Sequence, residues 1–228
     1  MSRLPVILDR SLSFPDPREA TGVGEFAGLV AIGGDLSVPR LLSAYRAGIF
    51  PWTTRPITWW SPDPRAIIEL EHFHVPRSVR RVLRRAPFVI TRDRAFQAVM
   101  EGCAAPARGR GQTWISREFI RAYTRLHQAG YAHSVECWRD GSLVGGIYGV
   151  AVGGFFAGES MFHRATDASK VALVHLVEHL RARQFALFDI QMITPVTALF
   201  GAINLPREVY LSRLESVNND PRFSQVRF

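Results

Sequence analysis

A short apolar stretch near the C-terminal end, "FALFDIQMI" (185–193), contains two polar side chains that could do chemistry, Asp189 and Gln191. Residues two apart in a strand point to the same side, so alternation predicts that this carboxylate and this carboxamide lie side by side. A second acid, Glu159, lies in a similar apolar stretch, "FFAGESMF". Burying an unpaired carboxylate costs several kcal/mol. These residues are therefore either internal partners of arginines or the polar groups of one small-ligand cleft.

The elements around these side chains are predicted to be strands and helices in mixed order. The segment "AHSVECWRDGSLVGGIYGVAVGGFFAGESMF" (132–162) is typical of a strand meander, and its Asp-Gly pair at 140–141 predicts a hairpin turn. An amphipathic helix is predicted over "TDASKVALVHLVEHLRARQ" (166–184), directly before the stretch that contains Asp189. Antiparallel strands, a long helix and one more strand predict an α+β fold.

The first part of the chain differs in composition, being rich in Pro, Gly and Trp, and it predicts a small N-terminal domain over residues 1–65 and a larger domain over residues 66–228. A short helix is expected between Ser37 as N-cap and Gly48 just past its end. The following segment, "IFPWTTRPITWWSPDPR" (49–65), contains four prolines, which predict a loop. Its tryptophans are either packing residues or an aromatic surface for a base.

A third candidate feature is a basic helix predicted over "VPRSVRRVLRRAP" (75–87), which Pro87 ends. Val79, Val82 and Leu83 fall on one face at helical spacing. The rest of the helix carries arginines and no acid: Arg77, Arg80, Arg81, Arg84 and Arg85. Because the guanidinium group matches phosphate oxygens in pairs, this face predicts phosphate binding, with a plain solvated face as the alternative.

Composition limits the remaining possibilities. The chain has 228 residues, 47% of them hydrophobic and 21% charged, and its net charge of +8 permits nucleic-acid binding. It has no apolar run of membrane-spanning length and no recognisable signal peptide, so a cytoplasmic location without a membrane partner is expected. The segment "HLVEH" (175–179) matches a zinc-peptidase pattern, but its polar residues lie away from the apolar stripe of the helix, so no metal is expected. Without coiled-coil heptads, a monomer is expected.

Several short motifs, taken in order, resemble those of the leucyl/phenylalanyl-tRNA–protein transferase family. They are "GGDLS", "GIFPW", "WWSPDPR", "EGCA", "TWIS", "AYTRLHQAGYAHSVE", "LVGGIYGV", "GESMF", "ASK" and "DIQ". The similarity runs from about residue 14 to about residue 211, nearly the whole chain. The sequence departs from the family after "DIQ", where Val196 or Thr197 stands in place of a His and Phe200 in place of a Leu.

The resemblance implies a fold and an activity. The fold is a small N-terminal α/β domain followed by an acetyltransferase-like domain with a mixed, mainly antiparallel sheet. The activity is transfer of Leu or Phe, and less readily Met, from aminoacyl-tRNA to the α-amine of proteins that begin with Arg or Lys. The product is marked for N-end-rule degradation, and no cofactor is implied.

The resemblance also implies roles for single residues. Gln191 would hold the attacking amine through its carbonyl oxygen, Asp189 would orient Gln191 and stabilise positive charge on the amine, and Glu159 would position the substrate. The pocket for the transferred side chain is implied to consist of Ile147, Phe156, Met161 and Leu173. Contacts to the 3′-terminal adenosine or the acceptor are implied for Trp52, Trp114 and Tyr123, and a contact to the acceptor is implied for Tyr45. The basic helix would hold the tRNA backbone.

Two other functions remain open from the sequence. A non-catalytic RNA-binding module could use the arginine helix and the tryptophans, and its binding would not depend on aminoacylation. Another aminoacyl-tRNA-dependent peptide transferase could have a related fold and a different acceptor.

Overall fold

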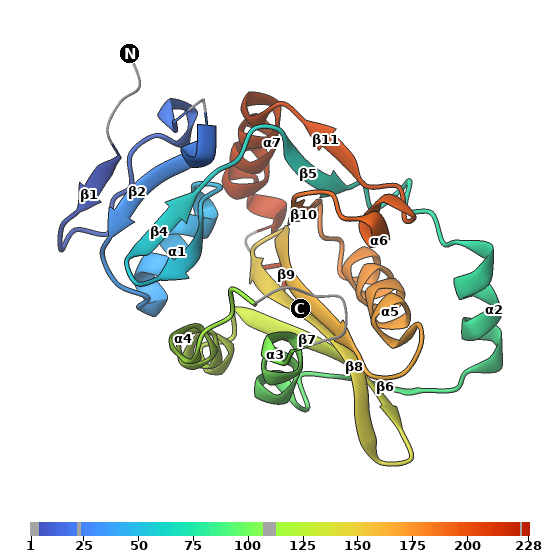
Figure 1. Ribbon diagram of the computed structural model, residues 1–228. Coiled ribbons are helices and arrows are strands. Elements are labelled where there is room, and N and C mark those ends of the chain that lie inside the picture. The colour runs from blue at the N-terminus through green and yellow to red at the C-terminus, as the bar shows by residue number, and fades with distance from the viewer. Residues whose placement is uncertain (1–4, 22–23, 107–112, 224) are drawn as a thin grey trace.

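The computed structural model describes residues 5–21, 24–106, 113–223 and 225–228, which form two sheets (Figure 1). The first sheet has the strand order β1 (Val6–Leu8), β2 (Leu29–Gly33), β4 (Ile57–Trp60) and β3 (Phe50–Thr54). Helix α1 and two short 3₁₀ helices complete this region: α1 (Val38–Arg46), η1 (Pro17–Glu19) and η2 (Gly24–Phe26).

The second sheet is larger and mixed. Its strand order is β11 (Ile203–Leu205), β5 (Arg65–Ile68), β10 (Leu187–Gln191), β9 (Phe155–His163), β8 (Ser142–Val152), β7 (Ala132–Arg139) and β6 (Val89–Arg92). Strands β9 and β10 pair in parallel, and the other neighbours pair antiparallel. The predicted Asp-Gly hairpin is confirmed between β7 and β8, where Asp140 and Gly141 have φ values of 50° and 72°.

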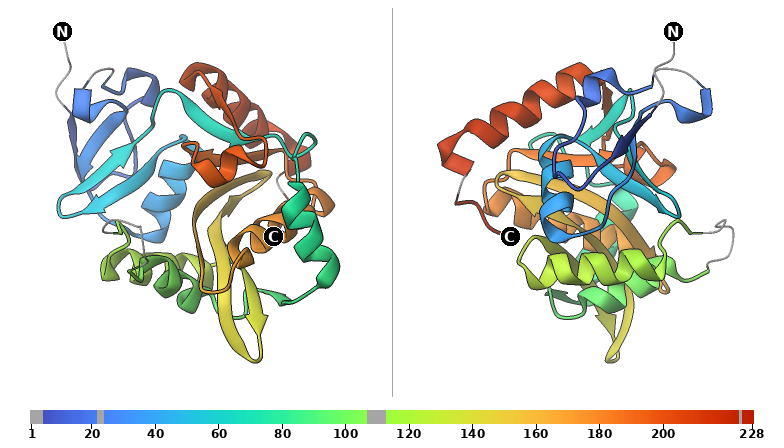
Figure 2. Two further views of the ribbon diagram at one scale, coloured as in Figure 1. Left: turned by 45° about the vertical axis from the view of Figure 1, so that its right-hand side comes forward. Right: turned by 90° about the vertical axis from the view of Figure 1, so that its left-hand side faces the viewer.

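Helices cover both faces of this second sheet (Figures 1 and 2). On one side, α5 packs on the strands and carries α2 on its outer surface; the other side holds α3, α4 and α7. The bounds are α2 (Arg77–Arg85), α3 (Phe96–Ala104), α4 (Arg117–Gln128), α5 (Ala168–Ala182), α6 (Pro195–Ala198), α7 (Arg207–Asn219) and η3 (Pro221–Phe223). Alternation divides the core: Phe155 packs into the cluster around α1, α4 and α7, and Phe156 into the cluster around α5. The structure thus confirms a mixed α/β chain.

The predicted loop over residues 49–65 is wrong, because β3 and β4 form a β-hairpin there. Strand β3 is at the edge of its sheet. An edge strand tolerates a proline such as Pro51, because the missing N–H can lie on the side that has no neighbouring strand. Pro56 lies between the two strands. Trp59 is fully buried and donates its indole N–H to the Gly33 carbonyl at 2.9 Å, so this tryptophan is a packing residue. Among the described segments, none of the helices has the length and apolar character needed to cross a membrane.

Candidate active site

The candidate site lies where the parallel strands β9 and β10 separate. Their last paired residues are Ala157 and Asp189; beyond them, β9 continues beside β8 and β10 beside β5. A cavity of about 870 Å³ lies at this opening, and Glu159 and Gln191 both line it. Each of these two residues lies at a β-bulge, since the pairing of β8 with β9 skips Glu159 and the pairing of β5 with β10 skips Ile190. Bulges of this kind commonly turn side chains toward a site.

Most of the predicted substrate-binding residues line this cavity. Its apolar wall includes Ile147 from β8, Met161 from β9 and Leu173 from α5. Trp52 comes from the N-terminal sheet and Trp114 from the segment before α4. The cavity is therefore bounded by both sheets.

Phe156 lies elsewhere. It is fully buried among the residues that pack under α5, and its ring lies edge-on to that of Phe188 at 5.8 Å. Phe188 lines the cavity and Phe156 packs behind it. The apolar wall of the cavity at this point is consequently Phe188, a residue that the sequence analysis did not select.

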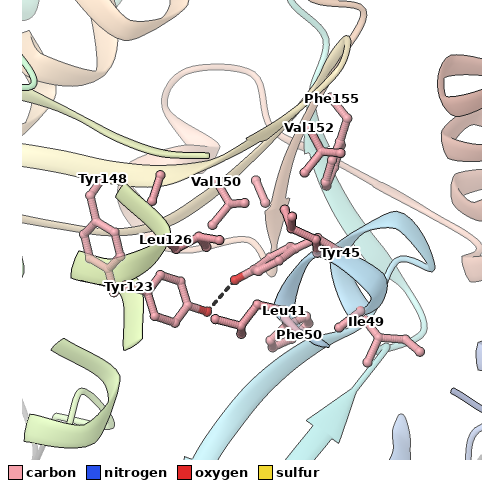
Figure 3. Close-up of a cluster of buried hydrophobic side chains, with 14 of the residues drawn as sticks. Leu41, Tyr45, Ile49, Phe50, Tyr123, Leu126, Tyr148, Val150, Val152 and Phe155 are labelled. Carbon is pink, nitrogen blue, oxygen red and sulfur yellow. Dashed lines mark hydrogen bonds between the residues drawn. The ribbon is translucent and has the colours of Figure 1, made fainter. Parts of the chain in front are cut away.

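A chain of hydrogen bonds extends from Glu159 to two buried tyrosines. Glu159 Oε1 accepts from the Tyr45 hydroxyl at 2.7 Å and from Gln191 Nε2 at 2.9 Å. Tyr45 and Tyr123 are joined by their hydroxyl oxygens at 2.5 Å, with Tyr45 on α1 and Tyr123 on α4 (Figure 3). Because the single Tyr45 proton points to Glu159, Tyr123 must donate to Tyr45. The predicted acceptor and adenosine contacts Tyr45 and Tyr123 therefore lie behind Glu159 and support it.

This chain has two consequences at the cavity. The Gln191 amide nitrogen is committed to Glu159, which leaves the Gln191 carbonyl oxygen as the group that can accept a proton donor from a ligand. Burial, with a smaller contribution from nearby Asp189, raises the pKa of Glu159 to about 7, against the opposing hydrogen bonds from Tyr45 and Gln191.

Asp189 is fully buried and is not among the described residues that line the cavity. Its carboxylate accepts from both Arg65 Nε (to Oδ1, 2.9 Å) and Arg65 Nη2 (to Oδ2, 2.6 Å). The Tyr210 hydroxyl donates to Oδ2 at 3.0 Å, and the Gln191 backbone N–H donates to Oδ1 at 2.9 Å. Asp189 thus reaches Gln191 through the main chain, whereas the Gln191 side chain reaches Glu159.

The prediction that Asp189 and Gln191 lie side by side through simple alternation is wrong, because the strand is irregular between them. Gln191 pairs with Ala66, the place that unbroken pairing would give to Ile190. Gln191 also has a φ of 62°, in the left-handed region that is unusual for a non-glycine residue.

Sequence reasoning missed Arg65 and Tyr210, and it also missed a polar end of the cavity. That end is formed by the end of β9 and the start of α5 and includes His163, Arg164, Thr166, Asp167, Ser169 and Lys170. Lys170 Nζ lies 2.7 Å from Asp167 Oδ1. A usable signal was present, since Lys170 is the only lysine of a chain that otherwise uses arginine.

The predicted basic helix is α2, and its five arginines are all exposed: Arg77, Arg80, Arg81, Arg84 and Arg85. Val79 is buried, and Val82 and Leu83 pack beside it on the cluster under α5. Within the described part of the chain, these arginines have no ion-pair partner. The helix therefore presents unpaired positive charge to solvent.

Among the described residues, one group has side chains close enough to be considered for a metal. Ligand atoms of Asp93, His127 and His133 lie within 4.8 Å of one another. Hydrogen bonds account for this arrangement: His133 Nδ1 lies 2.8 Å from Asp93 Oδ2, the Ser134 N–H donates to Asp93 Oδ1, and His127 Nδ1 lies 2.7 Å from the Ala132 carbonyl oxygen. The group does not line the cavity.

Comparison with known proteins gives matches over nearly the whole chain. Residues 67–215 match the family model for leucyl/phenylalanyl-tRNA protein transferase, and residues 34–63 match the model for the N-terminal domain of that transferase. A protein of Thiobacillus denitrificans is 53% identical over 207 residues, which cover 90% of this chain and 91% of that protein. A protein of Pseudoalteromonas atlantica is 48% identical, with 94% of this chain and 92% of that protein covered. A protein of an Anaeromyxobacter species is 51% identical, with 91% of this chain and 88% of that protein covered. All three relatives are named leucyl/phenylalanyl-tRNA–protein transferase.

Proposed function

The chain belongs to the leucyl/phenylalanyl-tRNA–protein transferase family and is an aminoacyltransferase, and from this premise we propose that the cavity between β9 and β10 is where the aminoacyl ester meets the acceptor amine. The observation that carries the proposal is the position of Glu159 and Gln191. Both follow the point where the strands separate, and they share a hydrogen bond at the wall of a cavity that has an apolar part and a polar end.

The transferred side chain occupies the apolar part of the cavity, beside Ile147, Met161 and Leu173. Leu, Phe and, less readily, Met fit a linear apolar pocket, and a pocket of this kind disfavours a β-branched competitor by only about 1–3 kcal/mol. The acceptor is a protein with N-terminal Arg or Lys, because Glu159, an acid on the wall that is not paired with a cation among the described residues, suits a cationic group. The product is marked for N-end-rule degradation.

The reaction requires positioning more than strong acid or base chemistry. A free α-amine has a pKa of about 7.7–8.0, so a useful fraction is uncharged at neutral pH. The side-chain carbonyl oxygen of Gln191 accepts a hydrogen bond from this amine. The side-chain nitrogen of Gln191 meanwhile donates to Glu159, which holds the amide in place. The amine nitrogen then forms a bond to the ester carbonyl carbon, the bond to the ribose 3′-oxygen breaks, and a proton passes from the amine to that oxygen. Holding two reactants in this way contributes up to about 7–11 kcal/mol.

The tRNA is held outside the cavity and at its rim. Trp52 and Trp114 provide aromatic faces on which the 3′-terminal base stacks, and the arginines of α2 bind backbone phosphates without reading sequence. We also propose a monomeric, cytoplasmic protein whose second domain is acetyltransferase-like. A domain boundary close to residue 65 is supported by the two sheets, since β4 of the first sheet ends at Trp60 and Arg65 already belongs to β5 of the second.

A peptide-transfer assay tests the proposed function. Labelled Leu-tRNA incubated with the protein and a peptide that begins with Arg is expected to give labelled peptide. The same peptide with an acetylated N-terminus should stay unlabelled, because its nucleophile is blocked. Absence of label in the Arg peptide overturns the proposal. Equal binding of charged and uncharged tRNA at one salt concentration would then favour a non-catalytic RNA-binding module, and transfer only to a different acceptor would favour a related peptide transferase.

The double variant Arg80→Gln/Arg84→Gln tests the role of α2. These residues are one turn apart on the exposed face. Affinity falls as salt rises, and each lost phosphate contact should make the slope of log affinity against log salt less steep by about 0.7–0.9. The affinity for Leu-tRNA should fall while kcat at saturating tRNA stays unchanged, because α2 does not line the cavity. Filter binding at several salt concentrations provides the measurement. The matched control is Arg121→Gln/Arg125→Gln on the exposed face of α4, which removes the same charge elsewhere. An equal effect of the two double variants would show that only net charge matters.

A further inference from the structure

Arg65 is a fully buried cation whose nitrogens all have partners. It is the first residue of β5, with 1% of its side chain exposed. Nε and Nη2 bind the two oxygens of Asp189, and Nη1 donates to the Gly48 carbonyl at 3.1 Å. The guanidinium lies over the rings of Phe50 and Tyr210, at 4.9 and 4.6 Å from their centroids. A guanidinium held this way is rigid, because its planar fork and its third nitrogen are hydrogen-bonded and two aromatic rings pack against it.

The same contacts decide what Asp189 can do. Its two oxygens accept four hydrogen bonds: two from Arg65, one from Tyr210 and one from the Gln191 backbone. The carboxylate charge is compensated by a guanidinium in direct contact, so the pair presents little net charge to a substrate amine. A substrate in the cavity meets Gln191 and not Asp189. Asp189 therefore acts on the reaction through Gln191.

The bond from Gln191 N–H to Asp189 Oδ1 lies at an unusual point of the main chain. Gln191 has a left-handed φ of 62° directly after the bulge in β10, a conformation that a non-glycine residue adopts only when its surroundings hold it. The hydrogen bond to an ionised oxygen stabilises this conformation. Because the bulge displaces Gln191 from the regular strand register, the direction of its side chain depends on this turn.

We propose that Arg65 is a positioning residue for aminoacyl transfer: with Asp189 and Tyr210 it forms a buried clamp that holds the main chain of Gln191 in its left-handed turn and so keeps the Gln191 amide at the cavity wall. The inference rests on the proposed function, in which Gln191 holds the acceptor amine. It assigns Asp189 to the clamp together with Arg65. A direct charge interaction between Asp189 and the amine would instead make the effects of Arg65 and Gln191 independent of each other.

A double-variant cycle between Arg65→Lys and Gln191→Ala separates these two cases. Lysine keeps the charge and loses the two-pronged contact, so kcat for peptide transfer is expected to fall by about 10–100-fold with KM for Leu-tRNA changed by less than about threefold. In the Arg65→Lys background, Gln191→Ala should cost only about 1–10-fold more, against about 10²-fold in the wild type, because Gln191 is already misplaced and the double variant should be about as slow as Gln191→Ala alone. A full 10²-fold cost in both backgrounds overturns the proposal.

Two further variants distinguish a specific loss of activity from a loss that results from unfolding. Tyr210→Phe removes only the hydroxyl that donates to Asp189, so it should lower kcat less than Arg65→Lys does. Gln191→Ala should again cost less in the Tyr210→Phe background than in the wild type. Arg40→Lys is the matched control, since Arg40 is equally buried and is paired with Asp35 at 3.2 Å, but it lies in the N-terminal region away from the clamp. It should keep the wild-type kcat. All assays are run well below each variant's unfolding temperature.

Amide hydrogen exchange of the Gln191 N–H gives a readout that does not depend on activity. Exchange in Arg65→Lys should be faster than in the wild type by about tenfold or more, and unchanged in Arg40→Lys. Unchanged exchange in Arg65→Lys overturns the clamp even if kcat falls. A wild-type protein without transfer activity overturns the proposed function, and with it the assignment of Arg65 to that reaction. The exchange data would still report whether Arg65 holds Gln191.

Discussion

Replacing Gln191 by alanine is expected to lower kcat for transfer by about 10²-fold while KM for Leu-tRNA changes by less than about threefold. The physical reason is that the Gln191 carbonyl oxygen is the acceptor left facing the cavity once its nitrogen is bound to Glu159. Removing it leaves the attacking amine free to rotate, while the tRNA contacts remain. Single-turnover transfer to an Arg peptide, with Leu-tRNA at saturation, measures the rate of the chemical step directly.

A second replacement at this position separates chemistry from folding. Asn tolerates left-handed backbone well and carries the same amide, but it is shorter by one methylene. Gln191→Asn should therefore fold like the wild type and still lose most of its activity, because its amide cannot reach both Glu159 and the amine. Gln97→Ala, on the exposed face of α3, is the control for loss of a glutamine. If Gln191→Ala keeps near-wild-type kcat, the amine is held by another group.

Local signals predicted the elements around the site. The Asp-Gly turn fixed the hairpin of β7 and β8, and hydrophobic periodicity predicted α5 and the strand that follows it. The hairpin of β3 and β4 was missed for a physical reason. Whether Pro51 is compatible with a strand depends on its being at a sheet edge, and the order of strands in a sheet is not a local property of the sequence.

The site was predictable in its residue types and not in its connections. Glu159 and Gln191 were identified because polar side chains within apolar strands are costly to bury without a partner, and both line the cavity. The partner of Asp189 was not identifiable, because Arg65 is 124 residues away along the chain. The bulges were equally invisible, and they decide which side chains face the cavity.

Glu159 combines a functional position with a cost in stability. Glu159 is 9% exposed, and burial raises its pKa to about 7 in the folded protein. In the unfolded chain the same carboxyl ionises at its ordinary pKa of 4.5, so folding disfavours the charged form. The folded state then binds more protons than the unfolded state between pH 4.5 and 7. By linkage, the contribution of Glu159 to stability falls as the pH rises through this window, and above pH 7 it is unfavourable by about 3 kcal/mol.

Replacing Glu159 by glutamine is therefore expected to stabilise the protein at alkaline pH. A neutral amide oxygen can still accept from Tyr45 and Gln191, so the hydrogen-bond chain persists without the buried charge. The free energy of unfolding of Glu159→Gln minus that of the wild type should grow by about 2–3 kcal/mol between pH 5 and pH 8. Urea unfolding at pH 5, 6, 7 and 8 measures this difference, and other titrating groups cancel in it.

The matched control is Glu178→Gln, which removes an exposed carboxylate from α5 and should give a nearly flat difference over the same range. A flat difference for Glu159→Gln as well would mean that Glu159 titrates normally and that its surroundings admit water. Transfer activity should fall in Glu159→Gln above pH 7, where wild-type Glu159 is ionised, because the Gln191 amide then donates its hydrogen bond to a neutral oxygen that holds it less firmly. A gain in stability together with a loss of activity is the expected behaviour of a buried acid retained for its function.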